Sequence, residues 1–144
     1  MGSMLQKNDM TAVQGAGGNT MSAPLHPLKT NLAVQFDQLD NLSKVKLEKI
    51  YMAFLGTCSC IVSRKKPIQR HHVRKYGNSG TACKPPDIYC VPLHHEYHTG
   101  DKGIHTLGEK TFCTRYDIDF DAEITRLHTM FEKYYGRLTD AERK

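Results

Sequence analysis

The stretch Ile68–His98, "IQRHHVRKYGNSGTACKPPDIYCVPLHHEYH", sets the expected fold. Its two ends, "IQRHHV" and "IYCVPL", are short runs that favour β-strands. Between them, Gly-Asn-Ser-Gly and Pro-Pro are typical of a loop. Pro92 ends the second run and fits the first turn of a helix, so "LHHEYHTGD" is expected to be a short helix running into a turn. The order is strand, loop, strand, helix.

Helices are expected on either side of this stretch. Asp40 or Ser43 can cap a helix with one apolar stripe, which Gly56 would end. A second amphipathic helix is expected to start with Asp119 or Asp121 as its cap and to end at Gly136. The run "CSCIVS" at 58–63 is a further strand-like piece. The chain is therefore expected to be α+β, with no internal repeats.

The sequence divides into an arm and a domain. Residues 1–35 are rich in Gly, Ser, Thr, Asn and Pro, with too few apolar residues to offset chain entropy. We therefore expect a flexible arm over 1–35 and one folded domain over 36–144. The chain has no apolar run long enough for a membrane span and no signal peptide pattern, which favours a cytoplasmic protein.

Charge points to a polyanionic partner. The net charge is +5, and no acidic residue occurs between Glu48 and Asp87. This balance is compatible with nucleic acid binding. The residues expected to contact DNA phosphates are Arg64, Lys65, Lys66, Arg70, Arg74, Lys75 and Lys84, and such contacts would weaken with salt.

Histidines are concentrated in the same region, where six of the eight lie between His71 and His105. Adjacent residues of a strand point to opposite faces, so His71 and His72 are expected to play different parts. His94 and His98 are four residues apart and would share one face of a helix, which suits a metal ion. A solvated basic strand is the alternative interpretation of the pair.

Taken in order, "HH", the Gly-rich loop, "KPPD", "VPL" and "HHEYH" resemble the HNH, or ββα-metal, endonucleases, over about Leu55–Asp119. Within this fold the sequence is most similar to the phage-type recombination enhancement nucleases that depend on RecA. The resemblance implies a small ββα-metal core with flanking helices. It also implies cleavage of DNA in recombination or repair, directed by a RecA filament.

The resemblance also assigns roles. It implies that His72 is the general base that activates water, with Asp87 near the place of the central Asn of the motif. It implies metal ligation by His71, His94 and His98, with His105 as the replacement if His94 points elsewhere. The cofactor would be a divalent ion, Mg²⁺, Mn²⁺ or Zn²⁺, and the base and the ion would flank one phosphate.

Two points leave other functions open. Many family members carry a structural zinc on two Cys-x-x-Cys knuckles. This chain has no such pair of knuckles, although Cys58, Cys60, Cys83 and Cys90 could still converge on a zinc ion. Asp87 also replaces the usual Asn. A catalytically silent zinc-binding adaptor for DNA or protein is therefore an alternative, and an RNA-directed nuclease is another.

Overall fold

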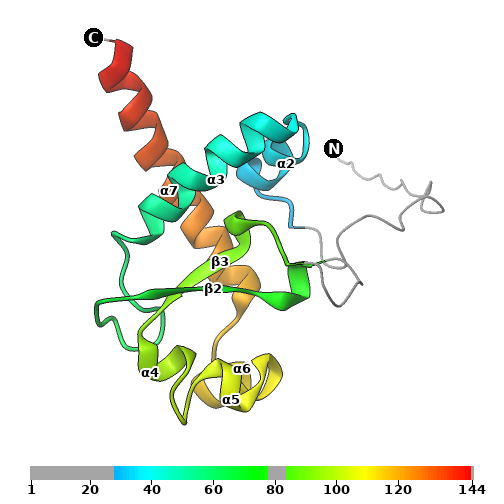
Figure 1. The fold of residues 1–144 in the computed structure, drawn as a ribbon, viewed down its shortest axis with the longest axis vertical. Helices are drawn as coiled ribbons and strands as arrows, with labels where there is room; N and C mark the ends of the chain where they lie inside the picture. The colour runs from blue at the N-terminus through cyan, green and yellow to red at the C-terminus, as the bar shows by residue number, and fades with distance from the viewer. Residues whose placement is uncertain (1–27, 78–83, 144) are drawn as a thin grey trace, which may run out of the picture.

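The computed structural model describes residues 28–77 and 84–143, with side chains up to Gly136. Its centre is an antiparallel pair of strands, β2 (Gln69–His72) and β3 (Cys90–Leu93), in which His71 pairs with Val91 and His72 with Cys90. Helices α3 (Asn41–Leu55) and α7 (Phe120–Arg143) lie on one side of this hairpin. The short helices α4 (His95–His98), α5 (Ile104–Leu107) and α6 (Glu109–Tyr116) lie on the other (Figure 1). The chain is therefore α+β, as expected from the sequence, and it is mostly helical.

The hairpin strands are short because their flanking residues turn away at once. The 3-10 turns η3 (Arg74–Tyr76) and η4 (Asp87–Tyr89) follow β2 and precede β3. All four residues of β3 are buried, and Pro92 is tolerated because its missing N–H faces no ladder partner in a two-stranded sheet. The carbonyl oxygen of Pro92 accepts from the amide of Ile61 (3.1 Å), so the turn at 57–66 covers part of this strand. The expected strand at 58–63 is instead a series of turns.

Capping residues fix where the long helices begin. Asp40 caps α3 by accepting from the amide of Ser43 (2.7 Å). Asp119 accepts from the amides of Asp121 and Ala122 at the start of α7 (3.0 and 3.3 Å). The expected end of the last helix at Gly136 is wrong, since α7 continues to Arg143.

The expected boundary of the arm is also wrong in part. Residues 1–27 lie outside the described residues, but helix α2 (Asn31–Asp37) already belongs to the fold. Thr30 caps it, and it buries Leu32, Ala33 and Phe36 in the core. These apolar residues lie at i, i+1 and i+4, which is enough for one buried face of a two-turn helix.

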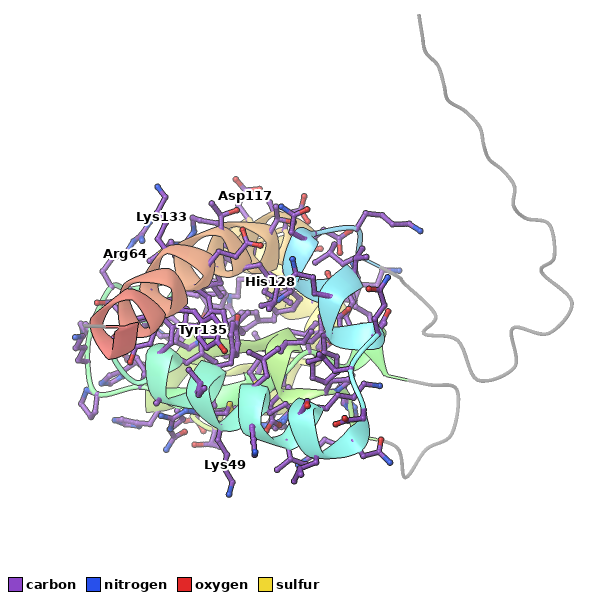
Figure 2. All side chains as sticks on the ribbon, turned by 90° about the horizontal axis from the view of Figure 1, so that it is seen from above. Lys49, Arg64, Asp117, His128, Lys133 and Tyr135 are labelled. Carbon is purple, nitrogen blue, oxygen red and sulfur yellow. The ribbon has the colours of Figure 1, made fainter. Side chains whose placement is uncertain are left out.

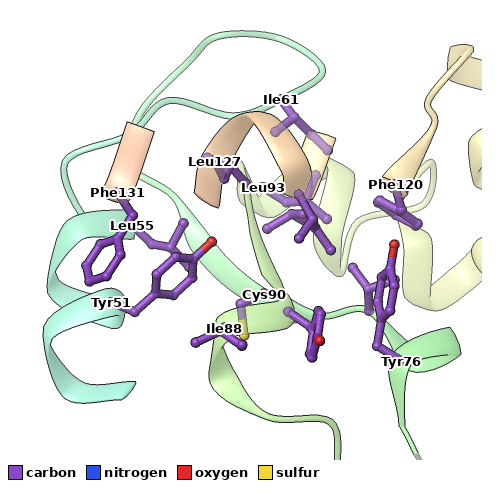
Figure 3. Packing of buried hydrophobic residues seen from close by; sticks show 14 of the residues in the cluster. Tyr51, Leu55, Ile61, Tyr76, Ile88, Cys90, Leu93, Phe120, Leu127 and Phe131 are labelled. Carbon is purple, nitrogen blue, oxygen red and sulfur yellow. The ribbon is translucent and has the colours of Figure 1, made fainter. Parts of the chain in front are cut away.

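The core lies between the hairpin and the helices α3 and α7. Tyr51 and Leu55 of α3 pack beside Phe131 of α7, and Leu93 of β3 lies near Leu127 (Figure 3). The rings of Tyr51 and Phe131 meet edge to face, with centroids 5.0 Å apart. This packing holds β3, and through it β2, in a fixed place relative to the helices.

One buried histidine links the first and last described helices. His128 of α7 is almost fully buried; its Nδ1 lies 2.7 Å from the Thr30 hydroxyl, and its Nε2 lies 2.7 Å from the Ile88 carbonyl oxygen. Because the carbonyl can only accept, Nε2 carries the proton and the Thr30 hydroxyl donates to Nδ1. The searched helices, those of residues 28–77 and 84–143, include none long and apolar enough to cross a bilayer.

Candidate metal centre

Three histidines converge on the side of the hairpin that carries the short helices. His71 comes from β2, His98 ends α4 and His105 lies in α5, and one ligand atom from each lies within 4.8 Å of the others. The Nε2 atoms of His98 and His105 are 3.0 Å apart. Two nitrogens bound to one tetrahedral Zn²⁺ at about 2.0–2.1 Å would lie about 3.3 Å apart. The three side chains thus fit a single small ion.

Two polar side chains orient this group. Glu109 Oε2 lies 3.0 Å from Nε2 of His71, and Gln69 Oε1 lies 2.7 Å from Nδ1 of His98. Nδ1 of His71 and Nε2 of His98 are therefore the nitrogens left for an ion. A metal-binding histidine commonly donates its other N–H to a carboxylate or an amide oxygen, which fixes its tautomer.

The chain brings Glu109 to His71 through a turn that needs glycine. Gly108 has φ +85°, which L side chains rarely adopt, and it joins α5 to α6. Glu109 is the first residue of α6, and its Oε2 also accepts from the amide of Arg74 (2.7 Å). One carboxylate therefore connects the metal centre to the end of β2.

His98 and His105 are in the form that binds a metal. Burial, together with the neighbouring His71 and His105, lowers the pKa of His98 to about 4. Burial and His71 also lower the pKa of His105. At neutral pH both imidazoles are neutral, which is the ligating form.

The centre is open on one side. His71 is buried, His98 is half-buried and His105 is exposed. Three protein ligands with one side open to solvent are typical of catalytic metal sites, which keep a position for water or substrate.

His94 is the predicted ligand that the structure does not bring to this group. It is the N-cap of α4, with extended backbone, and its ring accepts from the amide of Glu96 (3.4 Å). The pairing of His94 with His98 required His94 to lie inside the helix. Because α4 begins at His95, the two residues do not share a helix face. His105 takes its place, as the sequence allowed.

His72 lies on the opposite face of the strand. Its Nε2 is 2.7 Å from Asp87 Oδ1, and both side chains are about three-quarters buried. The amide of Asp87 donates to the carboxylate of Glu48 in α3 (2.7 Å). This bond holds the backbone of Asp87, and therefore its side chain, in place beside His72. The adjacent histidines thus belong to two separate groups of side chains, and His72, the predicted general base, does not lie in the group of His71, His98 and His105.

The predicted structural zinc site does not form from the described cysteines. Cys83 lies outside the described residues, and Cys58, Cys60 and Cys90 do not appear together in any described ligand group. Cys60 is buried in the turn after α3, where its sulfur accepts from the amides of Val62 and Ser63 (3.4 and 3.5 Å). Cys90 instead lies with His72 and Asp87, within the same 4.8 Å limit.

Several of the predicted DNA-binding cations contact other parts of the fold, and Lys65 pairs with Glu96 (3.5 Å). Arg70 donates to the carbonyl oxygen of Met52 (2.8 and 3.0 Å), and Lys75 pairs with Asp121 (3.1 Å). Lys66 donates to the carbonyl oxygen of Thr57 (3.1 Å). Exposed members are Arg64, Lys65, Lys66, Arg70, Arg74 and Lys84.

Comparison with known proteins adds no relative: no family model, no curated protein and no solved structure matches this chain. The function is therefore inferred from the site and from the resemblance of its motifs.

Proposed function

We propose that the protein is a metal-dependent DNA endonuclease of the HNH, or ββα-metal, class. The observation that carries this proposal is the convergence of His71, His98 and His105, with Glu109 and Gln69 orienting two of them. The order β2, β3, α4, with ligands on the first strand and on the helix, supports the same class.

The histidine–aspartate pair supplies the candidate base. Asp87 accepts from Nε2 of His72, which leaves Nδ1 as an acceptor that can take a proton from water. A carboxylate that fixes the tautomer of a histidine in this way is a recurrent arrangement in hydrolases. His71, His98 and His105 would hold a divalent ion, which would supply polarisation of the scissile phosphate and stabilisation of the departing oxygen.

The two faces of the hairpin set a requirement on the substrate. His72 is the last residue of β2, and β2 is an edge strand of a two-stranded sheet. A backbone phosphate therefore has to lie at the end of this strand to approach both His72 and the metal centre. The side-chain separation across the strand favours, as a second candidate, a zinc-binding adaptor that does not cleave.

A cleavage assay tests the proposal. Labelled single-stranded DNA, duplex DNA and RNA are incubated with the full chain in Mg²⁺, Mn²⁺, Zn²⁺ or EDTA, with and without a RecA filament. We expect metal-dependent cutting of DNA that His72→Ala abolishes and Asp87→Asn slows by about 10²-fold or more, with metal content unchanged.

Other results of the cleavage assay would change the substrate or the class of protein. Cutting that needs the filament would support the narrower assignment to the RecA-dependent nucleases, and cutting of RNA alone would replace DNA as the substrate. No cutting under any condition, with metal and DNA both bound, would overturn the nuclease and favour the adaptor.

A further inference from the structure

The turn between α3 and β2, residues 57–66, is cationic and is held by backbone hydrogen bonds. It lies in the part of the chain that has no acidic residue between Glu48 and Asp87. The amide of Arg64 donates to the carbonyl oxygen of Cys60 (2.9 Å). The amide of Cys60 donates to the carbonyl oxygen of Lys65 (3.1 Å). With the bond from Ile61 to Pro92 of β3, these contacts make the turn part of the folded body.

A cavity of about 310 Å³ lies between this turn and α7. Two arginines, Arg64 and Arg126, line it together with the hydroxyl residues Thr57 and Ser59, and no carboxylate side chain lines it. Guanidinium groups bind phosphate oxygens through paired N–H donors, and hydroxyls add further donors. The lining therefore selects an anion.

The backbone conformation of Arg64 is unusual for an arginine. Its φ is +66°, in the left-handed region where glycine or asparagine is usual. The side chain is exposed, and within residues 28–77 and 84–136 it makes no hydrogen bond or ion pair. An exposed arginine at a backbone position that suits glycine supports a role for its charge. Figure 2 shows Arg64 at the edge of α7, on the side from which Lys133 also projects.

The guanidinium of Arg126 is held in place by an ion pair with Glu123 of the same helix. Its Nε and Nη2 donate to Oε1 of Glu123 (3.3 and 2.8 Å), and its Nη1 lies 3.2 Å from the sulfur of Met130. A guanidinium has five N–H donors, so these contacts fix its plane and leave donors for an anion.

We propose that this cavity binds a phosphate of the DNA backbone some distance from the cleaved bond. The inference rests on the proposed function for the identity of the strand, whereas the phosphate chemistry comes from the cavity itself. Lys65 of the turn pairs with Glu96 of α4 (3.5 Å), the helix that carries His98. This ion pair places the turn beside α4, so the proposed path of the DNA runs from the candidate metal centre along the turn to the cavity.

The test measures binding without cleavage. Affinity of the full chain for a labelled oligonucleotide duplex is measured in EDTA across a range of salt, for the wild type and for Arg64→Gly, Arg64→Lys and Arg126→Gln. Lys49→Gln is the matched control, because it removes one exposed positive charge from α3, away from Arg64 in Figure 2. A titration with inorganic phosphate alone, followed by NMR of the arginine side chains, probes the cavity directly.

We expect Arg64→Gly to weaken duplex binding about tenfold and to lower the salt slope by about 1, with Arg64→Lys in between and Lys49→Gln near wild type. Folding stability of Arg64→Gly should be equal or higher, because glycine adopts positive φ without strain. Unchanged affinity and slope, or an equal loss in Lys49→Gln, would overturn the proposal. If inorganic phosphate binds but the variants bind the duplex as the wild type does, DNA is not the ligand of the cavity and free phosphate is.

Failure of the proposed function is distinguishable from failure of this inference. A wild type that binds DNA but does not cut it refutes the nuclease and leaves the binding comparison intact. If the wild type binds no DNA, the cavity does not bind a DNA phosphate. The phosphate titration then decides whether the cavity is an anion site.

Discussion

Nε2 of His71 and Oε2 of Glu109 lie 3.0 Å apart, although 38 positions separate the two residues in the chain. This contact joins a strand residue to the first residue of α6. It makes Glu109 the residue that sets the tautomer of the most buried candidate ligand, and the first prediction concerns it.

Replacing Glu109 by Gln should weaken metal binding about 10- to 100-fold while the fold is retained. The amide oxygen of Gln can still accept from Arg74, but it does not hold the imidazole N–H as a carboxylate does. Isothermal titration with Zn²⁺ or Co²⁺ measures the effect. Glu132→Gln, at an exposed position of α7, is the control, and equal affinities for both variants would refute the orienting role.

His105 and His94 should respond differently to replacement by alanine. His105→Ala removes a member of the converging group, so its loss of Co²⁺ affinity should exceed that of Glu109→Gln. His94→Ala should bind the metal as the wild type does, because His94 caps α4. Absorption of bound Co²⁺ reports the coordination, and a loss confined to His94→Ala would restore the ligand set implied by the resemblance.

Stability should fall as the pH is lowered through the range set by His128. Burial lowers the pKa of His128 to about 4, below the ordinary value of about 6.5. The unfolded chain therefore binds a proton first, and the stabilisation present above about pH 6.5 is lost as the pH falls towards 4, by about 2 kcal/mol at pH 5.

Urea unfolding in EDTA at pH 7.5 and at pH 5 tests this dependence. His128→Gln should show a smaller difference between the two pH values than the wild type. His98 also has a lowered pKa, and its contribution is the same in both proteins, so the comparison isolates His128. The same pH dependence in both proteins would show that the histidine is not responsible.

Tyr51→Phe should leave the protein equally stable or more stable by about 1 kcal/mol. The hydroxyl of Tyr51 is buried and has no hydrogen-bond partner among the described residues. Removing an unsatisfied buried hydroxyl removes its desolvation cost. Tyr116→Phe is the contrast, because its hydroxyl donates to the Lys102 carbonyl oxygen (3.1 Å) and its loss should destabilise. Thermal unfolding of both variants decides.

The strands and long helices were predictable because their signals are local. Strand runs, Pro92 and the capping aspartate at position 40 act on neighbouring residues. The start of α2 was missed because a short apolar run in a polar region gains its stability from packing on α7, which no local pattern shows. The continuation of α7 past Gly136 shows that one glycine does not end a helix that is otherwise favourable.

The candidate site was predictable in part. Alternation along a strand correctly separated His71 from His72, and the cluster of histidines indicated a metal centre. The choice between His94 and His105 depended on the residue at which α4 begins, which sequence patterns fix poorly. Glu109 and Gln69 were not found, because their roles depend on contacts with His71 and His98, which are distant in the sequence.

The carboxylate of Glu109 accepts from the Arg74 amide as well as from His71. Binding of an ion at the candidate centre would therefore be coupled to the opening of the Arg74 amide, just after β2. Deuterium uptake at that single amide would record loading of the centre in solution, with no substrate and no chromophore.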